Sequence, residues 1–373
     1  MKIDAIILRE LSMSLIHPFA TSFGETKERR ILLAEVRSEG FSGWGECTTG
    51  EHPHFSEEST DTAWVTILQE LAPLLTSAEE PTGGRCSNIF RVVRGHRMAK
   101  AALENALWDL EAQMRGVPLS ELLGGIRETI VCGVSIGIQP SLEKLMEKVE
   151  VAIGQGYQRI KLKCKPGWDV QMFEAIRHRW PDIMLSCDAN SAYRLKDADH
   201  LTTFDQYNLL MIEQPLWADD FYFHVMLQQR LDTAICLDES IRNRRDALAA
   251  IEMESCRIIN IKLGRVGGFS EAIAIHNATQ ERGIPVWCGG MLESGIGRSH
   301  NIAMSSLENF RLPGDVSASS RYWREDIIEP EVTVSPAGEI RVPRTPGRGF
   351  EVRTDLIERL TVRKEEIKAM ALV

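Results

Sequence analysis

The chain is 373 residues long, 43% hydrophobic and 26% charged, with a formal net charge of −10 at pH 7. This length allows a sizeable core and more than one domain. The acidic balance, without a basic stripe, argues against a nucleic-acid partner, and no uncharged apolar run approaches the roughly 18 residues of a membrane span. Because a charge falls inside the first apolar run, we expect no export signal and a soluble, cytoplasmic protein.

Residues 1–125 predict a small α+β capping domain that begins with strands. Residues 3–15 and 30–36 read as strands, and a turn-rich stretch follows at 40–46, which is typical of an antiparallel meander.

Two helices should complete this domain. The first is expected at 57–71, with Ser56 as its N-cap and Pro73 ending or kinking it. The second is expected at 97–115, where apolar residues recur four apart until Gly116 stops the helix.

Residues 126–328 contain a repeat of short apolar runs that end in charged residues. Five of these charges are spaced by 25, 25, 25 and 24 positions: Lys163, Asp188, Glu213, Asp238 and Lys262. A strand, a return helix and two loops fill about 25 to 30 residues, and such runs are typical of strands in a parallel sheet. The repeat therefore predicts an α/β fold with a (β/α)8, TIM-like barrel, whose strand ends bring these side chains to one mouth.

Several elements of the barrel can be placed from the sequence. We expect strands at 129–136, 159–163, near 285–288 and near 310–312, and helices at 142–153 and 269–282. Residues 329–373 contain strand-like pieces at 331–334 and 339–342, and we expect this C-terminal segment to fold back onto the cap. The eight cysteines include no C-x-x-C pair, which favours free buried thiols over disulfides or a zinc site.

The three acids on neighbouring strand ends predict a metal site. Asp188, Glu213 and Asp238 supply hard oxygen ligands without His or Cys, which suits Mg²⁺, with Mn²⁺ or another divalent ion as a substitute. A single acid could simply pair with a lysine or cap a helix, but three at equal spacing favour a metal.

Three lysines should face the same site. Lys161 and Lys163 lie two apart on one strand and so project to the same side, while Lys262 stands across the barrel axis. Inward ammonium groups near a divalent cation repel, and we expect this repulsion to lower a lysine pKa so that it can accept a proton. A metal with lysines on two faces fits removal of a proton next to a carboxylate; enolase-superfamily sites use this arrangement.

The chain resembles the enolase superfamily, muconate-lactonizing subgroup, over essentially its whole length. The resemblance rests on Lys161-Leu162-Lys163, Asp188-Ala189-Asn190, Glu213-Gln214-Pro215, Asp238-Glu239-Ser240, the stretch 262–268 and the junction 118–125. Within this subgroup it is most similar to the o-succinylbenzoate synthase / N-acylamino acid (N-succinylamino acid) racemase family, on the stretches 289–298 and 313–323.

The resemblance implies roles for individual residues. Asp188, Glu213 and Asp238 would hold Mg²⁺, and Lys163 and Lys262 would stand on the two faces of the reacting carbon. Lys161 would contact the substrate carboxylate and tune Lys163. Asn190 would lie near the metal and the substrate, and Ser135 would contact the acyl group.

Cap loops are expected to set specificity. The residues that could wall an apolar pocket are Phe19, Phe23, Phe55 and Met291, although ordinary cap core is an equal reading for each of them. His52 and His54 have no third partner nearby in sequence, and we interpret them as loop or surface residues.

The expected substrate is a small-molecule carboxylate, and the expected assembly is a homo-oligomer. Dehydration to o-succinylbenzoate, in menaquinone synthesis, needs one base with a cation opposite it, whereas N-acylamino acid racemisation needs a base on each face. The lysines satisfy both reactions. Another cycloisomerase or a dipeptide epimerase is the alternative, although epimerases carry Asp-x-Asp where this chain has Asp315-Val316-Ser317. A non-catalytic barrel that binds an anion or a protein is the alternative from another class.

Overall fold

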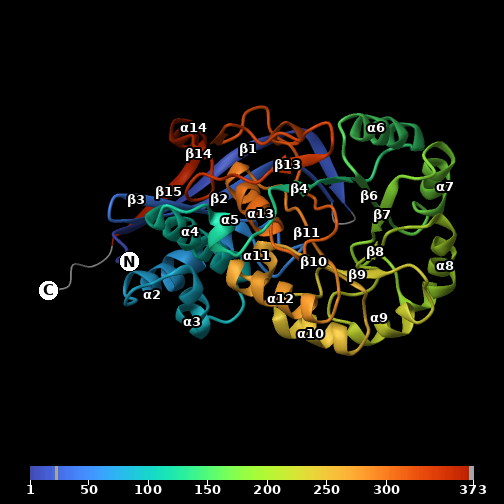
Figure 1. Ribbon diagram of the computed structural model, residues 1–373, viewed down its shortest axis with the longest axis horizontal. Coiled ribbons are helices and arrows are strands. Elements are labelled where there is room, and N and C mark those ends of the chain that lie inside the picture. Colours follow the sequence, from blue (N-terminus) through green and yellow to red (C-terminus); the bar gives the residue numbers. More distant parts are fainter. Residues whose placement is uncertain (22–23, 369–373) are drawn as a thin grey trace.

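The computed structural model describes residues 1–21 and 24–368, and it contains an antiparallel sheet with helices beside a ring of parallel strands (Figure 1). The cap-and-barrel prediction is therefore confirmed. In these residues no helix is long and apolar enough to cross a bilayer. All eight cysteines are free and buried, as expected.

The cap is built on a four-stranded antiparallel sheet of order β15-β1-β2-β3. Its strands are β1 (Ala5–Thr21), β2 (Gly24–Ser38), β3 (Phe41–Cys47) and β15 (Thr361–Lys368). Strand β15, near the end of the described residues, pairs with β1, so this part of the C-terminal segment lies in the cap sheet (Figure 1).

The cap helices pack on one face of this sheet. They are α1 (Thr60–Thr66), α2 (Ala72–Thr76), α3 (Cys86–Ile89) and α4 (Arg97–Arg115). The short helix α5 (Leu119–Leu122) follows at the junction with the barrel and packs in the core shared with the barrel. The expected helix at 97–115 matches α4, which ends at Gly116 in the left-handed conformation. Two glycines of β3, at 43 and 45, let α4 lie directly on the sheet, because a Cβ at either would meet an α4 carbonyl oxygen at about 2 Å.

The predicted start and end of the first helix are wrong. Its N-cap is Ser59, not Ser56. Pro73 does not end the helix: a π-helical turn at Ile67–Leu71 precedes this proline, and α2 continues to Thr76. Glu58 lies outside the helix because its carboxylate accepts hydrogen bonds from the backbone N–H groups of Met98 (2.8 Å) and Ala99 (3.0 Å). It thus satisfies donors that the first turn of α4 cannot pair internally.

The barrel contains seven parallel strands in the order β11-β10-β9-β8-β7-β6-β5. They are β5 (Gly133–Ile136), β6 (Arg159–Lys163), β7 (Met184–Asp188), β8 (Ile212–Glu213), β9 (Ile235–Leu237), β10 (Ile258–Ile261) and β11 (Val286–Cys288). The surrounding helices are α6 (Leu142–Gly154), α7 (Val170–Arg179), α8 (Ala198–Thr202), α9 (Phe221–Gln228), α10 (Arg244–Glu252), α11 (Leu263–Val266), α12 (Phe269–Glu281) and α13 (Gly295–Ser305).

The strand expected near 310–312 does not form. The barrel closes instead through irregular backbone: Asn309 accepts from the N–H of Val286 (3.2 Å), and Gly314 bonds to both Val131 and Gly133. The strand expected at 129–136 is likewise divided, because β4 (Thr129–Val131) leaves the barrel and pairs with β13 (Glu339–Arg341).

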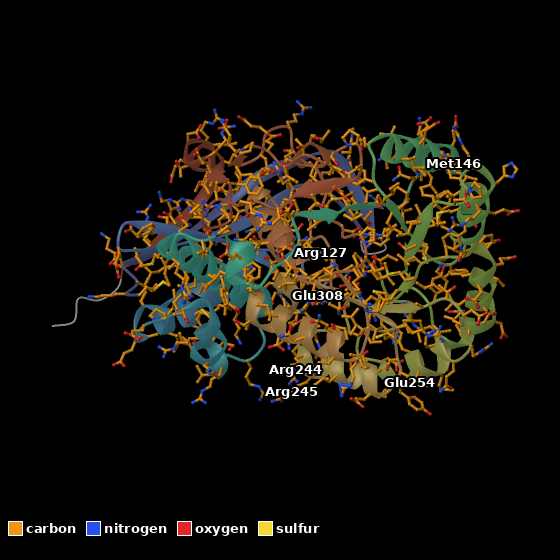
Figure 2. The ribbon with its side chains drawn as sticks, viewed as in Figure 1. Arg127, Met146, Arg244, Arg245, Glu254 and Glu308 are labelled. Carbon is orange, nitrogen blue, oxygen red and sulfur yellow. The ribbon has the colours of Figure 1, made fainter. Side chains whose placement is uncertain are left out.

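The remaining C-terminal elements are short. They are β12 (Ile328–Glu329), β14 (Glu351–Val352) and α14 (Thr354–Leu360). No strand forms at 331–334, where that segment was expected to be extended. Arg244 and Arg245 at the start of α10 and Glu254 just after its end are exposed at the surface of the barrel (Figure 2).

Candidate active site

The charged residues predicted from the spacing lie together at the carboxyl ends of the barrel strands. Lys163, Asp188 and Glu213 face one another in register across β6, β7 and β8. Asp238 and Lys262 come directly after β9 and β10. In a parallel barrel this end forms the mouth where binding groups collect.

Each acid of this group is paired with a lysine. The Nζ atom of Lys163 lies 2.6 Å from Asp188, that of Lys161 lies 2.7 Å from Glu213, and that of Lys262 lies 2.7 Å from Asp238. All three carboxylates are at most 1% exposed. Such pairs are tolerable in an interior only when both charges are present.

The electrostatics hold Lys161 strongly protonated. Burial alone lowers the pKa of Lys161, but the carboxylates of Asp315, Glu213 and Asp188 raise it by more, so its pKa lies above the usual value. Burial likewise raises the pKa of Asp188, while Lys163 and Lys161 pull it well below its usual range. The expectation that a divalent cation beside the lysines lowers a lysine pKa stays a prediction.

Asp315 and Arg159 complete the surroundings of Lys161 and were not assigned this role from the sequence. One Asp315 oxygen lies 2.8 Å from Lys161 Nζ, and the other accepts from Arg159 at 2.6 Å. The indole of Trp287 lies beneath both cations, 4.6 Å and 4.7 Å from its centroid. Arg159 lies two residues before Lys161 on the same strand face, and this spacing is the signal that could have identified it.

Asn190 and Glu239 form a second polar chain at the mouth. Lys163 donates to the Asn190 Oδ1 atom (2.7 Å), and the Asn190 amide donates to Glu239 Oε1 (2.9 Å). Among the described residues, the other Glu239 oxygen is buried without a hydrogen-bond partner. Burial, with Asp188 nearby, raises the pKa of Glu239.

Two further residues hold the acids in place. Asn260 donates to Glu213 Oε1 (2.7 Å), and Arg265 contacts Asp238. Asn260 lies two residues before Lys262, so its inward direction could have been read from the strand period.

A cavity of about 580 Å³ opens above these groups. The barrel contributes Lys163, Asn190 and Lys262, and the loop after β11 contributes Met291. Phe19 and Phe55 line it from the cap, so three of the residues predicted to wall the pocket do lie there. Phe23 falls outside the described residues.

The predicted acyl contact Ser135 is not among the lining residues of this cavity. It pairs with Lys161 across β5 and β6, and its backbone carbonyl accepts from Arg321 (2.8 Å). His52 and His54 are exposed, as expected, and they line the cavity, with ring centroids 5.4 Å apart.

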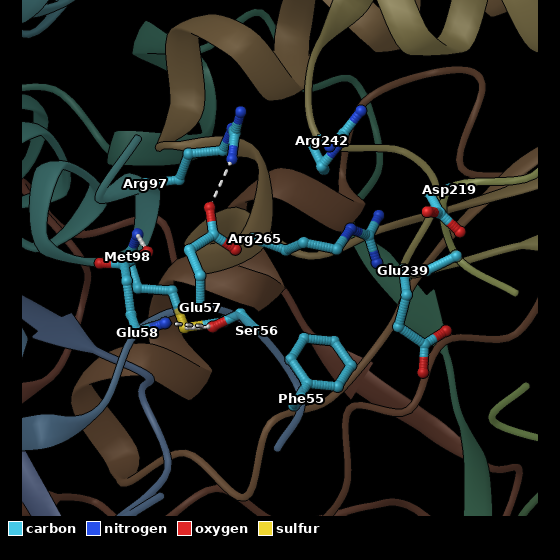
Figure 3. A pocket seen from close by; sticks show the side chains of 11 residues that line it. Phe55, Ser56, Glu57, Glu58, Arg97, Met98, Asp219, Glu239, Arg242 and Arg265 are labelled. Carbon is cyan, nitrogen blue, oxygen red and sulfur yellow. Dashed lines mark hydrogen bonds and ion pairs between the residues drawn. The ribbon is translucent and has the colours of Figure 1, made fainter. Parts of the chain in front are cut away.

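The cap is seated on the barrel at this mouth. The N–H of Ile138, just after β5, donates to the carbonyl of Ala20 at the tip of the β1–β2 hairpin (3.1 Å). The Phe55 ring lies 4.4 Å from the Lys262 ammonium. Figure 3 shows Phe55 on the wall of a second, smaller cavity of about 170 Å³ that Glu239, Arg265 and Arg97 also line.

The donor set fits a hard divalent cation. Asp188, Glu213 and Asp238 offer buried carboxylate oxygens on adjacent strands, and an unpartnered oxygen of Glu239 lies at the same mouth. Within residues 1–21 and 24–368 the three acids do not form a closed metal cluster, and each is ion-paired with a lysine. The oxygen chemistry suits Mg²⁺, as in enolase-superfamily sites generally.

Comparison with known proteins agrees with this geometry. The chain is 52% identical to an o-succinylbenzoate synthase of Geobacillus stearothermophilus, over 96% of each chain. It is 43% identical to an N-succinylamino acid racemase of an Amycolatopsis species, over 98% of this chain and 99% of the other. A solved enolase-superfamily structure from Listeria innocua superposes with a TM-score of 0.96 at 40% identity, covering 99% of this chain and 100% of the other.

Both parts of the chain match domain families. Residues 2–124 match the mandelate racemase / muconate lactonizing enzyme N-terminal domain, and residues 144–356 match the enolase C-terminal domain-like family. Together with the relatives above, these matches show that the chain belongs to the enolase superfamily, in the family of o-succinylbenzoate synthases and N-succinylamino acid racemases.

Proposed function

We propose that the protein removes the α-proton of a carboxylate substrate and acts as an o-succinylbenzoate synthase, an N-succinylamino acid racemase, or both. The observation that carries this proposal is the placement of Lys163 and Lys262. Both line the same cavity, and their strands β6 and β10 are separated by three others in the barrel. A substrate between them would meet an amine from each side.

The two lysines would share the chemistry. One takes the proton from the α-carbon, and the ammonium of the other faces the enediolate from the opposite side and stabilises its charge. For racemisation the second lysine returns a proton to the other face. For dehydration, the hydroxyl on the neighbouring carbon leaves as water with the proton that the base removed, while the opposing ammonium stabilises the enediolate.

A divalent cation held by Asp188, Glu213 and Asp238 would supply further positive charge beside the substrate carboxylate. Lys161, kept protonated by Asp315 and Glu213, would contact the same carboxylate. Phe19, Phe55 and Met291 would exclude water from the reacting carbon.

The surroundings of Asp315 argue against a dipeptide epimerase. Its two oxygens face Arg159 and Lys161, and the Ser317 hydroxyl two positions on accepts from Arg298 (3.1 Å). Because the Asp315 carboxylate and the Ser317 hydroxyl already bind cationic side chains of the protein, they are poorly placed to hold a substrate ammonium. A non-catalytic barrel would not require a lysine on each side of one cavity.

The test uses the purified protein, stripped of metal and then supplied with Mg²⁺. N-succinyl-L-phenylalanine and its D-enantiomer are followed by chiral chromatography, and the cyclohexadiene precursor of o-succinylbenzoate is followed by absorbance. We expect turnover of at least one substrate class that requires the added ion. No turnover of either class, with no stabilisation by Mg²⁺, would favour a binding barrel instead.

A further inference from the structure

Arg29 is a buried cation on the cap side of the main cavity. It lies on β2 and alternates with Ile31 and Leu33, which pack in the core shared by cap and barrel. Arg29 is nearer the tip of the β1–β2 hairpin than these two residues, and it lines the cavity where their core ends. The hairpin thus carries a positive charge towards the barrel mouth.

The Nε–H group of Arg29 lacks an acceptor among the described residues. Arg29 is only 7% exposed, yet its Nε atom makes no hydrogen bond to any part of the chain that the structure describes. A buried donor without an acceptor costs free energy, and a buried charge costs more. Native interiors rarely keep such a group unless something binds to it.

The two carboxylates that act on Arg29 electrostatically, Glu46 and Glu293, are hydrogen-bonded to other groups. Glu46 accepts from the Ser294 hydroxyl (2.6 Å) and the Gly297 N–H (3.0 Å), both at the start of α13. Glu293 accepts from the Met291 N–H (2.8 Å) and the Asn301 amide (2.9 Å). Both acids influence Arg29 through space, but no ion pair within 4.0 Å joins either one to it among the described residues. An acceptor for the Arg29 guanidinium could therefore reach it from the cavity, which Arg29 lines.

We propose that Arg29 binds the carboxylate of the substrate that is remote from the reacting carbon, and so selects dicarboxylates such as N-succinylamino acids. This inference rests on the proposed function, which places the reacting carboxylate at the lysine end of the cavity. A guanidinium suits this task because its planar fork can bind both oxygens of a carboxylate. A site built around such a contact rejects analogues that lack the charged group.

The experiment compares two substrates that differ only in the remote group. N-succinyl-phenylalanine carries a terminal carboxylate, and N-butanoyl-phenylalanine has a methyl group in its place. Their kcat/KM values for racemisation are measured with the wild-type protein, with Arg29→Met, which keeps length but removes charge, and with Arg29→Lys. Arg37→Met is the matched control, since Arg37 lies on the same strand, pairs with Glu35 (2.6 Å) and does not line the cavity.

We expect Arg29→Met to lower kcat/KM for the succinyl substrate by about 10- to 100-fold, mainly through KM, as for loss of charge-assisted hydrogen bonds. The butanoyl value should change less than about threefold, because that substrate makes no ionic contact to lose. Arg29→Lys should retain part of the preference, and Arg37→Met should retain all of it. An equal loss on both substrates, or no loss on either, would overturn the inference and leave the proposed function standing.

The wild-type protein provides a test that does not depend on the folding of any variant. If it racemises the butanoyl substrate as efficiently as the succinyl substrate, Arg29 does not select the remote carboxylate. If it neither racemises nor exchanges the α-proton of either compound, the proposed function itself fails, and this inference fails with it.

Discussion

Glu46 joins the cap to the barrel and provides a stability test of the interface. It lies in β3, is 2% exposed, and caps the start of α13 through Ser294 and Gly297. Burial raises the pKa of Glu46 to about 7, the hydrogen bonds from Ser294 oppose this shift, and the charge of Glu293 adds to it. The buried cation Arg29 also faces this acid.

The sign of the pH effect follows from this shift. The folded protein binds the Glu46 proton more tightly than the unfolded chain does, with a pKa of about 7 against 4.5. The contribution of Glu46 to stability is therefore fully present below pH 4.5 and is lost as pH rises through 7. A shift of this size corresponds to about 3 kcal/mol between the two limits.

The perturbation is Glu46→Gln, which keeps the shape of the protonated acid and does not titrate. The free energy of unfolding of the variant, relative to wild type, should rise by about 3 kcal/mol between pH 4.5 and 8. For a chain of this length that is a change of about 4 °C in the Tm difference. Other groups, including Glu104, whose pKa burial also raises to about 7, cancel in this comparison. A Tm difference that stays constant across this pH range would show that Glu46 is ionised in the folded protein.

Three further changes test separate parts of the account. Glu213→Gln removes one carboxylate charge from the proposed metal site, so Mg²⁺ affinity by calorimetry and turnover should fall together; unchanged activity at low Mg²⁺ would exclude Glu213 from the site. Met291→Ala should raise KM for apolar N-acyl substrates by the equivalent of roughly 1–3 kcal/mol, and an equal effect on every substrate would assign Met291 to cap structure. Gly45→Ala places a Cβ 1.9 Å from the carbonyl oxygen of Ala102, so thermal unfolding should show a loss of about 1–3 kcal/mol, and an unchanged Tm would contradict this packing.

Much of the fold could be predicted because its signals are local. The helix α4 carries an apolar stripe and a glycine stop within its own sequence, and β6 matches the expected 159–163. The closure of the barrel could not be predicted, because residues 309–315 bond to β11 and to the start of the barrel without forming a regular strand. The start of α1 was missed for a similar reason, since Glu58 caps α4, some 40 residues away.

In the active site, too, some residues could be predicted from the sequence and others could not. The strand-end spacing correctly brought Lys163, Asp188, Glu213, Asp238 and Lys262 together, because a barrel fixes where strand ends point. Arg159 and Asn260 lie two residues before Lys161 and Lys262 and could be read from the strand period, whereas Glu239 and Asp315 come from loops and had no such signal. Arg29 has no local signal at all, since its importance depends on how the cap hairpin meets the barrel.

Other expectations stay predictions. They are the division into 1–125, 126–328 and 329–373, the homo-oligomer, and the cytoplasmic location. The roles of the individual site residues also stay predictions, and the central one is the assignment of the two bases.

That assignment is tested most directly by proton exchange in single lysine variants. Lys262→Ala and Lys163→Ala are each incubated in D₂O with Mg²⁺ and with each enantiomer of N-succinyl-phenylalanine, and deuterium at the α-carbon is followed by NMR. With a base on each face, both variants should lose racemisation, while each still exchanges the α-proton of one enantiomer, and the two variants should prefer opposite enantiomers. Exchange of both enantiomers at wild-type rates in both variants would show that neither lysine is the base.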